Sequence, residues 1–204
     1  MKIPRLALCL ATLAFAATGF SAGWTEQPLK YSIQWPYDLK EDARYRFKDG
    51  VHDFVVYKTD KPLRPGSTTE PRTEMKIEND YSSGAHRFEA DVYVPAGTSG
   101  VSIMQVFGGT GGHATSLQLR VYRGDLMRYR FETVAHDVYD RWFHLGVIHN
   151  VETHQILIFV DGQPAGEARD NGGSSHYFKC GVYTQDNPSD RMEVRFKNIR
   201  IYEQ

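Results

Sequence analysis

Residues 177–185 (YFKCGVYTQ) combine side chains that can transfer a proton or bind an anion. Aromatic and β-branched residues dominate the segment and a Gly-Gly-Ser-Ser loop precedes it, so we expect a strand. Alternation puts Tyr177, Lys179, Gly181, Tyr183 and Gln185 on one face, opposite an apolar set of Phe178, Cys180 and Val182. A glycine lets a neighbouring group approach the backbone closely. The polar face is therefore predicted to form one side of a groove for an anionic ligand.

Three further predicted strands present polar side chains that suit the same task. They offer Arg72, Glu74 and Lys76 from 72–78, Gln105 from 101–107, and Gln118, Arg120 and Tyr122 from 117–123. An outward polar side chain on a single strand is ordinarily just solvated. The prediction therefore depends on the grouping of four such faces. It depends also on arginine, whose planar fork binds a carboxylate at two points.

Composition favours one β-rich domain. The chain has 204 residues, 13% aromatic residues and 18 glycines, which is typical of an all-β domain with many turns. The formal net charge is -1, so no global basic field indicates nucleic acid, and attraction for an anion must be local.

The N-terminus has the pattern of a secretory signal. Lys2 and Arg5 precede a short apolar run at 6–17, which is too short to span a bilayer comfortably. We expect a signal peptide at 1–22, a single domain at 23–204, and no membrane partner. The expected location is extracellular, and a vacuole is the alternative that the sequence leaves open.

The cysteines and acidic residues predict no metal or redox site. Cys9 would be removed with the signal peptide. Cys180 lies on the apolar face of its strand, where we expect it to pack in the core. No cluster of His, Cys, Asp and Glu has zinc-like spacing. We expect no cofactor, although structural calcium held by scattered aspartates stays open.

The order of patterns along the chain predicts a sandwich. We expect strands at 51–58, 72–78, 86–94, 101–107, 117–123, 127–131, 141–149, 155–160, 163–168, 177–185 and 192–202, with one or two more in 24–50. No amphipathic helix follows the glycine-rich stretch 108–112, which excludes a phosphate-binding P-loop. About ten to twelve short strands suit an all-β jelly-roll sandwich of two antiparallel sheets with a concave groove.

Three segments resemble the signatures of the alginate-lyase and glucuronan-lyase group of polysaccharide lyases. They are Arg72-Thr73-Glu74, Gln105-Val106-Phe107 and 177–185. A longer likeness, over about 31–202, is to plant citrate-binding proteins and their relatives; it includes 45–52, 97–108 and 139–143. The resemblance implies a β-jelly roll that acts on acidic polysaccharide by β-elimination.

The resemblance also implies roles for individual residues. Arg72 and Gln105 would neutralise a uronate carboxylate, Tyr183 would act as acid and in some members also as base, and Lys179 would add positive potential. The remaining groove residues would contact substrate; they are Tyr177, Glu74, Lys76, Gln118, Arg120, Tyr122 and Gln185.

One position departs from the lyase pattern. Those enzymes commonly have histidine two residues after the glutamine, where this chain has Phe107. A replacement base would come from His52, His86 or His113, with His52 ranked first, or Tyr183 would serve both roles.

Two functions follow as hypotheses. The first is a secreted, monomeric lyase that cleaves a polyuronate such as glucuronan or alginate. The alternative is a non-catalytic protein on the same fold that binds citrate or another small carboxylate, and a plain carbohydrate-binding module is a third option.

Overall fold

The computed structural model describes residues 23–110 and 112–204. These residues form fifteen β-strands and one short 3-10 helix. The elements are β1 (Thr25–Gln27), β2 (Tyr31–Gln34), η1 (Glu41–Ala43), β3 (Tyr45–Lys48), β4 (Val51–Tyr57), β5 (Arg72–Ile77), β6 (Ala85–Tyr93), β7 (Val101–Phe107), β8 (Thr115–Tyr122), β9 (Asp125–Arg128), β10 (Glu132–Ala135), β11 (Trp142–Asn150), β12 (Gln155–Val160), β13 (Gln163–Arg169), β14 (Tyr177–Thr184) and β15 (Arg191–Glu203). In this described part, no helix is long and apolar enough to cross a membrane. The predicted signal peptide, 1–22, lies outside the described residues.

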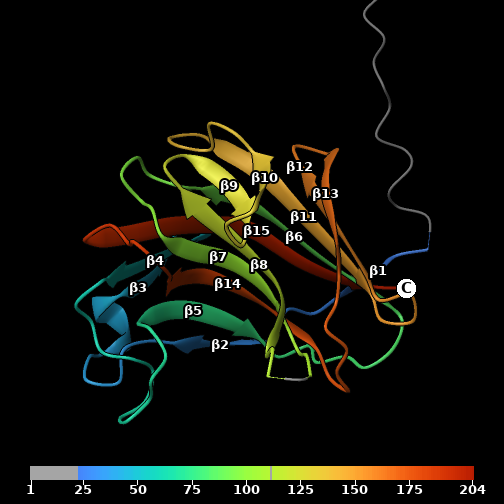
Figure 1. The fold of residues 1–204 in the computed structure, drawn as a ribbon, viewed down its shortest axis with the longest axis horizontal. Coiled ribbons are helices and arrows are strands. Elements are labelled where there is room, and N and C mark those ends of the chain that lie inside the picture. Colours follow the sequence, from blue (N-terminus) through green and yellow to red (C-terminus); the bar gives the residue numbers. More distant parts are fainter. Residues whose placement is uncertain (1–22, 111) are drawn as a thin grey trace, which may run out of the picture.

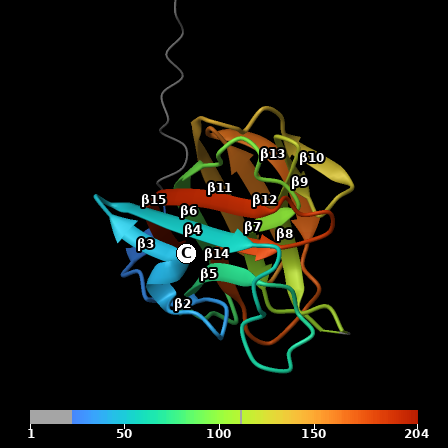
Figure 2. The same cartoon turned by 90° about the vertical axis from the view of Figure 1, so that its left-hand side faces the viewer.

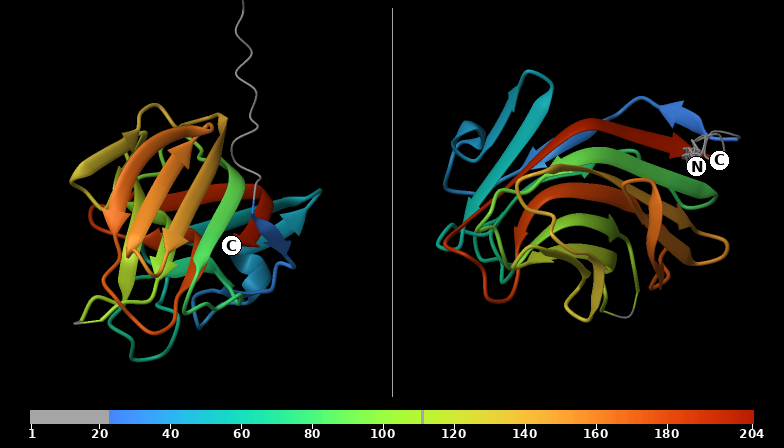
Figure 3. Two further views of the ribbon diagram at one scale, coloured as in Figure 1. Left: turned by 90° about the vertical axis from the view of Figure 1, so that its right-hand side faces the viewer. Right: turned by 90° about the horizontal axis from the view of Figure 1, so that it is seen from above.

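The strands pack as two antiparallel sheets (Figure 1). One sheet has the order β13-β12-β11-β6-β15-β4-β3, with β1 paired to β15, and the other has the order β10-β9-β8-β7-β14-β5-β2. Both sheets curve in the same sense, and the outer face of the second is concave (Figure 3). We call them the convex sheet and the concave sheet. Strands distant in sequence are neighbours in both, and this topology confirms the predicted all-β jelly-roll sandwich.

The core fills the space between the sheets. It is built from the alternate residues of each strand that point between the sheets. Its largest fully buried side chains include Phe54, Phe88, Phe143, Phe178, Phe196, Met75, Ile77, Leu117 and Leu119. Each such residue stabilises the fold by about 1.5–3 kcal/mol through the removal of apolar surface from water. Cys180 is among the buried residues, and burial raises the pKa of its thiol, so packing is its role. Because every second side chain of a concave-sheet strand points into this core, the polar side chains between them must face outward.

Tight turns set the register of the hairpins. Three of them place two consecutive residues at positive φ, namely Asp49-Gly50, Arg123-Gly124 and Asp161-Gly162, as short β-hairpin turns require. The predicted strand at 127–131 was wrong in its bounds. β9 ends at Arg128, and Tyr129 takes φ 52° in a turn that leads to β10, which the sequence pattern did not predict.

Gly181 brings β5 and β14 together. Its φ is +136°, and a Cβ there would lie 2.5 Å from the Thr73 carbonyl oxygen and 2.8 Å from the Glu74 Cα. The group that approaches the glycine is therefore the backbone of the neighbouring strand. The register between β14 and β7 also shifts between Cys180 and Tyr183, as a β-bulge does. The pairing of β14 with β5 runs without a shift and places Tyr183 opposite Arg72 and Gly181 opposite Glu74.

The β3–β4 hairpin lies at one edge of the convex sheet, beside η1 (Figure 2). It carries His52, which therefore belongs to a different sheet from the predicted groove residues.

Candidate functional site

A buried carboxylate lies at the centre of the concave face. Glu74 of β5 is 1% exposed. Its Oε2 lies 2.6 Å from Lys179 Nζ of β14 and 3.4 Å from Arg72 Nη1. Its Oε1 accepts a short hydrogen bond from the Gln105 amide of β7. A buried charge is costly unless it is paired and hydrogen-bonded, and these three partners on three adjacent strands meet that need.

A line of amides extends this centre across the sheet. Gln118 Nε2 of β8 donates to Gln105 Oε1 at 3.3 Å, and Arg120 Nε donates to Gln118 Oε1 at 2.8 Å. Charged groups at both ends fix which way each amide points, because Glu74 only accepts and Arg120 only donates. The strand register supports the line, since it pairs Gln105 with both Gln118 and Lys179. Six of the predicted residues, on four strands, thus form one connected network: Arg72, Glu74, Lys179, Gln105, Gln118 and Arg120.

An outer layer of cationic and aromatic side chains covers this buried floor. The Arg72 guanidinium stacks over the Tyr183 ring, 3.8 Å from its centroid. Lys76 Nζ lies 4.6 Å from the Tyr177 ring centroid, and that ring stacks on Phe107 with centroids 4.7 Å apart. These outer residues are half-buried, whereas Glu74, Gln105 and Lys179 are buried. A ligand on the concave face would therefore meet the outer layer first.

The site carries a positive excess. Four cations, Arg72, Lys76, Arg120 and Lys179, lie on this face with two carboxylates: Glu74, which contacts Arg72 and Lys179, and Asp80, whose Oδ1 lies 3.9 Å from Lys76 Nζ. Burial lowers the pKa of the Lys179 ammonium, and the adjacent Glu74 carboxylate opposes that effect. Burial, with Asp80 and Glu74 nearby, raises the pKa of Tyr177 to about 12, so Tyr177 stays neutral. The face is accordingly suited to an anion.

Two predicted groove residues have more local roles. The Gln185 amide donates to the carbonyl oxygen of Thr184 at 2.8 Å, so it is engaged by its own backbone. Tyr122 lies further along β8, where its ring contacts the Arg130 guanidinium at 4.8 Å. A pocket of about 410 Å³ continues from Tyr122; Ser99, Arg123, Asp125, Met127, Arg130 and Asn187 complete its lining.

Sequence reasoning missed Tyr129 at the same edge. Its ring lies 5.1 Å from the Arg120 guanidinium carbon. The pattern put Tyr129 inside a strand, where its orientation would follow alternation. The turn at φ 52° directs it to Arg120 instead, and no local sequence signal specified that turn.

The predicted histidines do not join the cluster. His52 of β4 packs among Tyr45, Phe47 and Phe54 of the convex sheet and Tyr31 of β2, the edge strand of the concave sheet, and its Nδ1 hydrogen-bonds the Tyr45 hydroxyl at 2.8 Å. His86 stacks on Tyr81 and hydrogen-bonds the Ser83 carbonyl, while His113 lies exposed in the loop before β8. Among the described residues, no histidine hydrogen-bonds Glu74, Gln105 or Tyr183.

His52 instead should make stability depend on pH. Burial lowers the pKa of His52 to about 4, against about 6.5 for an unfolded histidine. The unfolded chain therefore binds the proton first as pH falls, and stability is lost from about pH 6.5 down to about 4. We expect a loss on the order of 2–3 kcal/mol from this group. Urea unfolding at pH 7 and 4.5 should show a smaller loss in His52→Gln than in the unaltered chain.

The exposed His136 offers the matched control, because His136→Gln removes a histidine from the surface. An equal pH dependence in His52→Gln and His136→Gln would contradict the assignment to His52.

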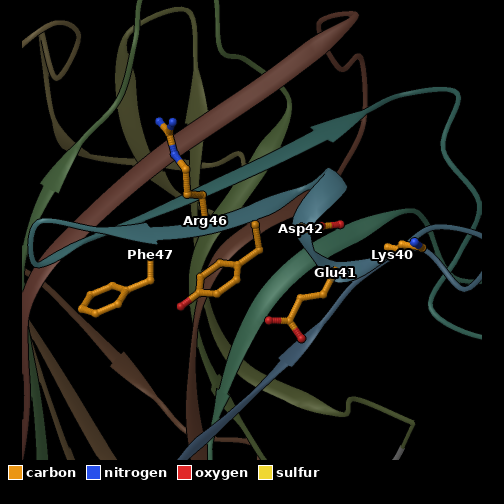
Figure 4. A pocket seen from close by; sticks show the side chains of 6 residues that line it. Lys40, Glu41, Asp42, Arg46 and Phe47 are labelled. Carbon is orange, nitrogen blue, oxygen red and sulfur yellow. The ribbon is translucent and has the colours of Figure 1, made fainter.

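A second surface pocket lies away from the polar face. It has a volume of about 450 Å³ and is lined by Lys40, Glu41, Asp42, Tyr45, Arg46 and Phe47 around η1 and β3 (Figure 4). Arg46 points away from Glu41 and Asp42, so charges of both signs diverge there (Figure 4). This pocket lacks a converging set of groups, and the concave face is the better candidate site.

The fold and this face define a jelly-roll sandwich whose concave sheet carries a cationic, aromatic site. A sequence model described as alginate lyase matches residues 29–203. The chain therefore belongs to the alginate lyase family. The citrate-binding protein of Hevea brasiliensis is 48% identical over 193 residues, covering 92% of this chain and 81% of that protein.

Solved structures share the fold at low sequence identity. The alginate lyase AlgAT5 of polysaccharide lyase family 7 superposes with a TM-score of 0.68 at 15% identity, covering 85% of this chain and 94% of that one. The alginate lyase from Corynebacterium sp. gives 0.69 at 13% identity, with coverage of 85% and 94%. At these identities the likeness supports the sandwich architecture alone.

Proposed function

We propose that this protein is a polysaccharide lyase that cleaves a uronate polymer, such as glucuronan or alginate, by β-elimination. The observation that carries the proposal is the stacking of Arg72 on Tyr183 directly above the buried Glu74–Gln105–Lys179 network. It places a carboxylate-binding cation beside a group able to transfer protons. Family membership is consistent with this reaction class.

The chemistry assigns a role to each layer. Arg72 binds the uronate carboxylate and stabilises the charge that develops on it when the C5 proton leaves. The Tyr183 oxygen takes that proton as phenolate and delivers a proton to the glycosidic oxygen as the C4–O bond breaks and the C4–C5 double bond forms. Gln105, Glu74 and Lys179 position Arg72 and add potential from below. His52 takes no part in this scheme.

Unsaturated products absorb ultraviolet light, which gives a direct test. The purified chain should produce a rising absorbance with glucuronan or alginate, and none with a neutral glucan that lacks the carboxylate. A flat trace over a panel of polyuronates and a broad pH range would remove the lyase proposal.

A second candidate is a protein that binds citrate or a similar small carboxylate without turnover. Phe107 favours it, because a ring stacked on Tyr177 occupies the position where the lyases commonly carry histidine. The name of the Hevea relative points the same way. Calorimetry with citrate tests it; absence of both heat and thermal stabilisation at millimolar citrate would count against it.

A further inference from the structure

Three potential metal ligands lie close together outside the candidate site, on β11 and in the segment between β13 and β14. They are His149 of β11, Asp170 just after β13, and His176 just before β14. One ligand atom from each lies within 4.8 Å of the others. The two imidazole rings meet edge to face with centroids 4.7 Å apart. Spacings of 21 and 6 residues along the chain explain why no local motif revealed this group.

The His176 ring is buried and has no hydrogen-bond partner, which indicates a missing ligand. The residue is 0% exposed, and both of its ring nitrogens are buried without a hydrogen-bond partner. Leaving a buried polar group unsatisfied destabilises the fold, and native structures seldom contain one without a reason. An apolar residue would avoid this cost if packing were the only requirement.

The fold holds the His176 ring in place. Its backbone exchanges two hydrogen bonds with Tyr81, at 2.7 and 2.9 Å. A Cβ on Gly108 would lie 2.5 Å from His176 Nδ1, and one on Gly173 would lie 3.3 Å from its Cε1. The ring is thus clasped between two glycine backbones, and its orientation does not depend on a hydrogen bond.

The other two ligands are oriented from behind. His149 Nδ1 hydrogen-bonds the Tyr81 hydroxyl at 2.9 Å, which leaves Nε2 directed at Asp170 Oδ2, 2.7 Å away. Asp170 Oδ1 accepts from the Gly172 amide at 2.9 Å and lies 2.9 Å from His154 Nδ1. Hydrogen bonds behind each ligand atom are what fix tautomer and direction at metal sites. A cation between Nε2 and Oδ2 would replace the single hydrogen bond that now joins them.

We propose that His149, Asp170 and His176 bind one divalent transition-metal ion of the zinc type. Two imidazoles and one carboxylate match the ligands that Zn²⁺ prefers, whereas Ca²⁺ takes six to eight oxygens. Three protein ligands leave one tetrahedral position for water. The ion would link β11 to the loop that leads into β14, the strand that carries Lys179 and Tyr183.

Metal titration of the purified full chain after chelation tests the site. Zn²⁺ should bind at one ion per chain by calorimetry, and Co²⁺ should give the visible bands of a tetrahedral site. His176→Leu should weaken binding by about 100-fold or more, while His136→Gln, at an exposed histidine, should leave it unchanged. Absence of dication binding, or equal affinity in His176→Leu and the unaltered chain, would overturn the proposal.

A second variant and a stability measurement keep the test decisive. Asp170→Asn is nearly isosteric, so its loss of metal affinity cannot be ascribed to a change of shape. In chelator, His176→Leu should be at least as stable as the unaltered chain, since it removes two unsatisfied nitrogens. With Zn²⁺ present, the order should reverse. No change in melting temperature of the unaltered chain with Zn²⁺ would contradict the site.

Discussion

Replacing Tyr183 by phenylalanine should lower cleavage of the preferred polyuronate by about 10²–10⁴-fold, the range that a positioned acid or base contributes. The substitution removes one oxygen and keeps the ring on which Arg72 stacks, 3.8 Å from the centroid. Affinity for the uronate should therefore change little, because the guanidinium that binds the carboxylate stays in place. Initial rates from ultraviolet absorbance, with binding measured separately by calorimetry, separate these two effects.

Tyr177 provides the matched control for this prediction. It lies on the same strand and the same face, but its ring is held between Lys76 and Phe107. Its pKa, raised to about 12, keeps the phenol protonated at neutral pH, so almost no phenolate is available to accept the proton. Tyr177→Phe should therefore retain most of the activity. If Tyr183→Phe and Tyr177→Phe cleaved at the same rate as the unaltered chain, Tyr183 would have no part in proton transfer.

The sandwich was predictable because its signals are local. Alternation over 72–78 separates Arg72, Glu74 and Lys76 from Thr73, Met75 and Ile77, and the structure buries the second set at 0% exposure. The Asp161-Gly162 pair specified its hairpin, since both positions require positive φ. The two-residue alternation of apolar side chains and the residue types of tight turns depend on neighbours in sequence. Both can therefore be recognised without knowledge of the partner strands.

The internal order of the site was not predictable, because it depends on register between strands. Nothing local indicates that Glu74 is buried while Arg72, two residues earlier on the same face, reaches the surface layer. The difference arises because Glu74 is opposite Gly181, which offers no side chain, and beside Lys179 and Gln105. The same limit applied to His52, whose alternation fits a strand but whose sheet could not be assigned.

Burial also changes what the network means for ligand binding. A strand face with Arg, Lys and Gln suggests that all of these side chains contact the ligand directly. In this structure, however, Glu74 already offsets part of the positive charge of Arg72 and Lys179. The site therefore has an internal carboxylate that holds Lys179 and Gln105 in position before any ligand arrives. Such preorganisation reduces the entropy that binding must overcome, and it predicts that the network contributes to folding as well as to recognition.

Replacing Lys179 by methionine should accordingly destabilise the fold by about 2–4 kcal/mol, somewhat less than the cost of leaving a buried charge wholly uncompensated, because Arg72 still offsets part of the Glu74 charge. Glu74 would retain only the Gln105 amide and Arg72 Nη1 at 3.4 Å. The double variant Lys179→Met/Glu74→Gln removes both charges, so it should recover much of the loss. Urea unfolding of the single and double variants measures both quantities.

The ion pair Lys58–Asp190 is a closely matched control for the pair Lys179–Glu74. Its Nζ–Oδ1 distance is 2.6 Å, the same as that of Lys179 and Glu74, but both side chains are exposed. Lys58→Met should therefore change the free energy of unfolding little, since exposed ion pairs contribute little. A similar small loss in Lys58→Met and Lys179→Met would show that distance alone, rather than burial, sets the effect, and that the Glu74 network is not a structural centre. The large difference is expected because water screens the first pair and is excluded from the second.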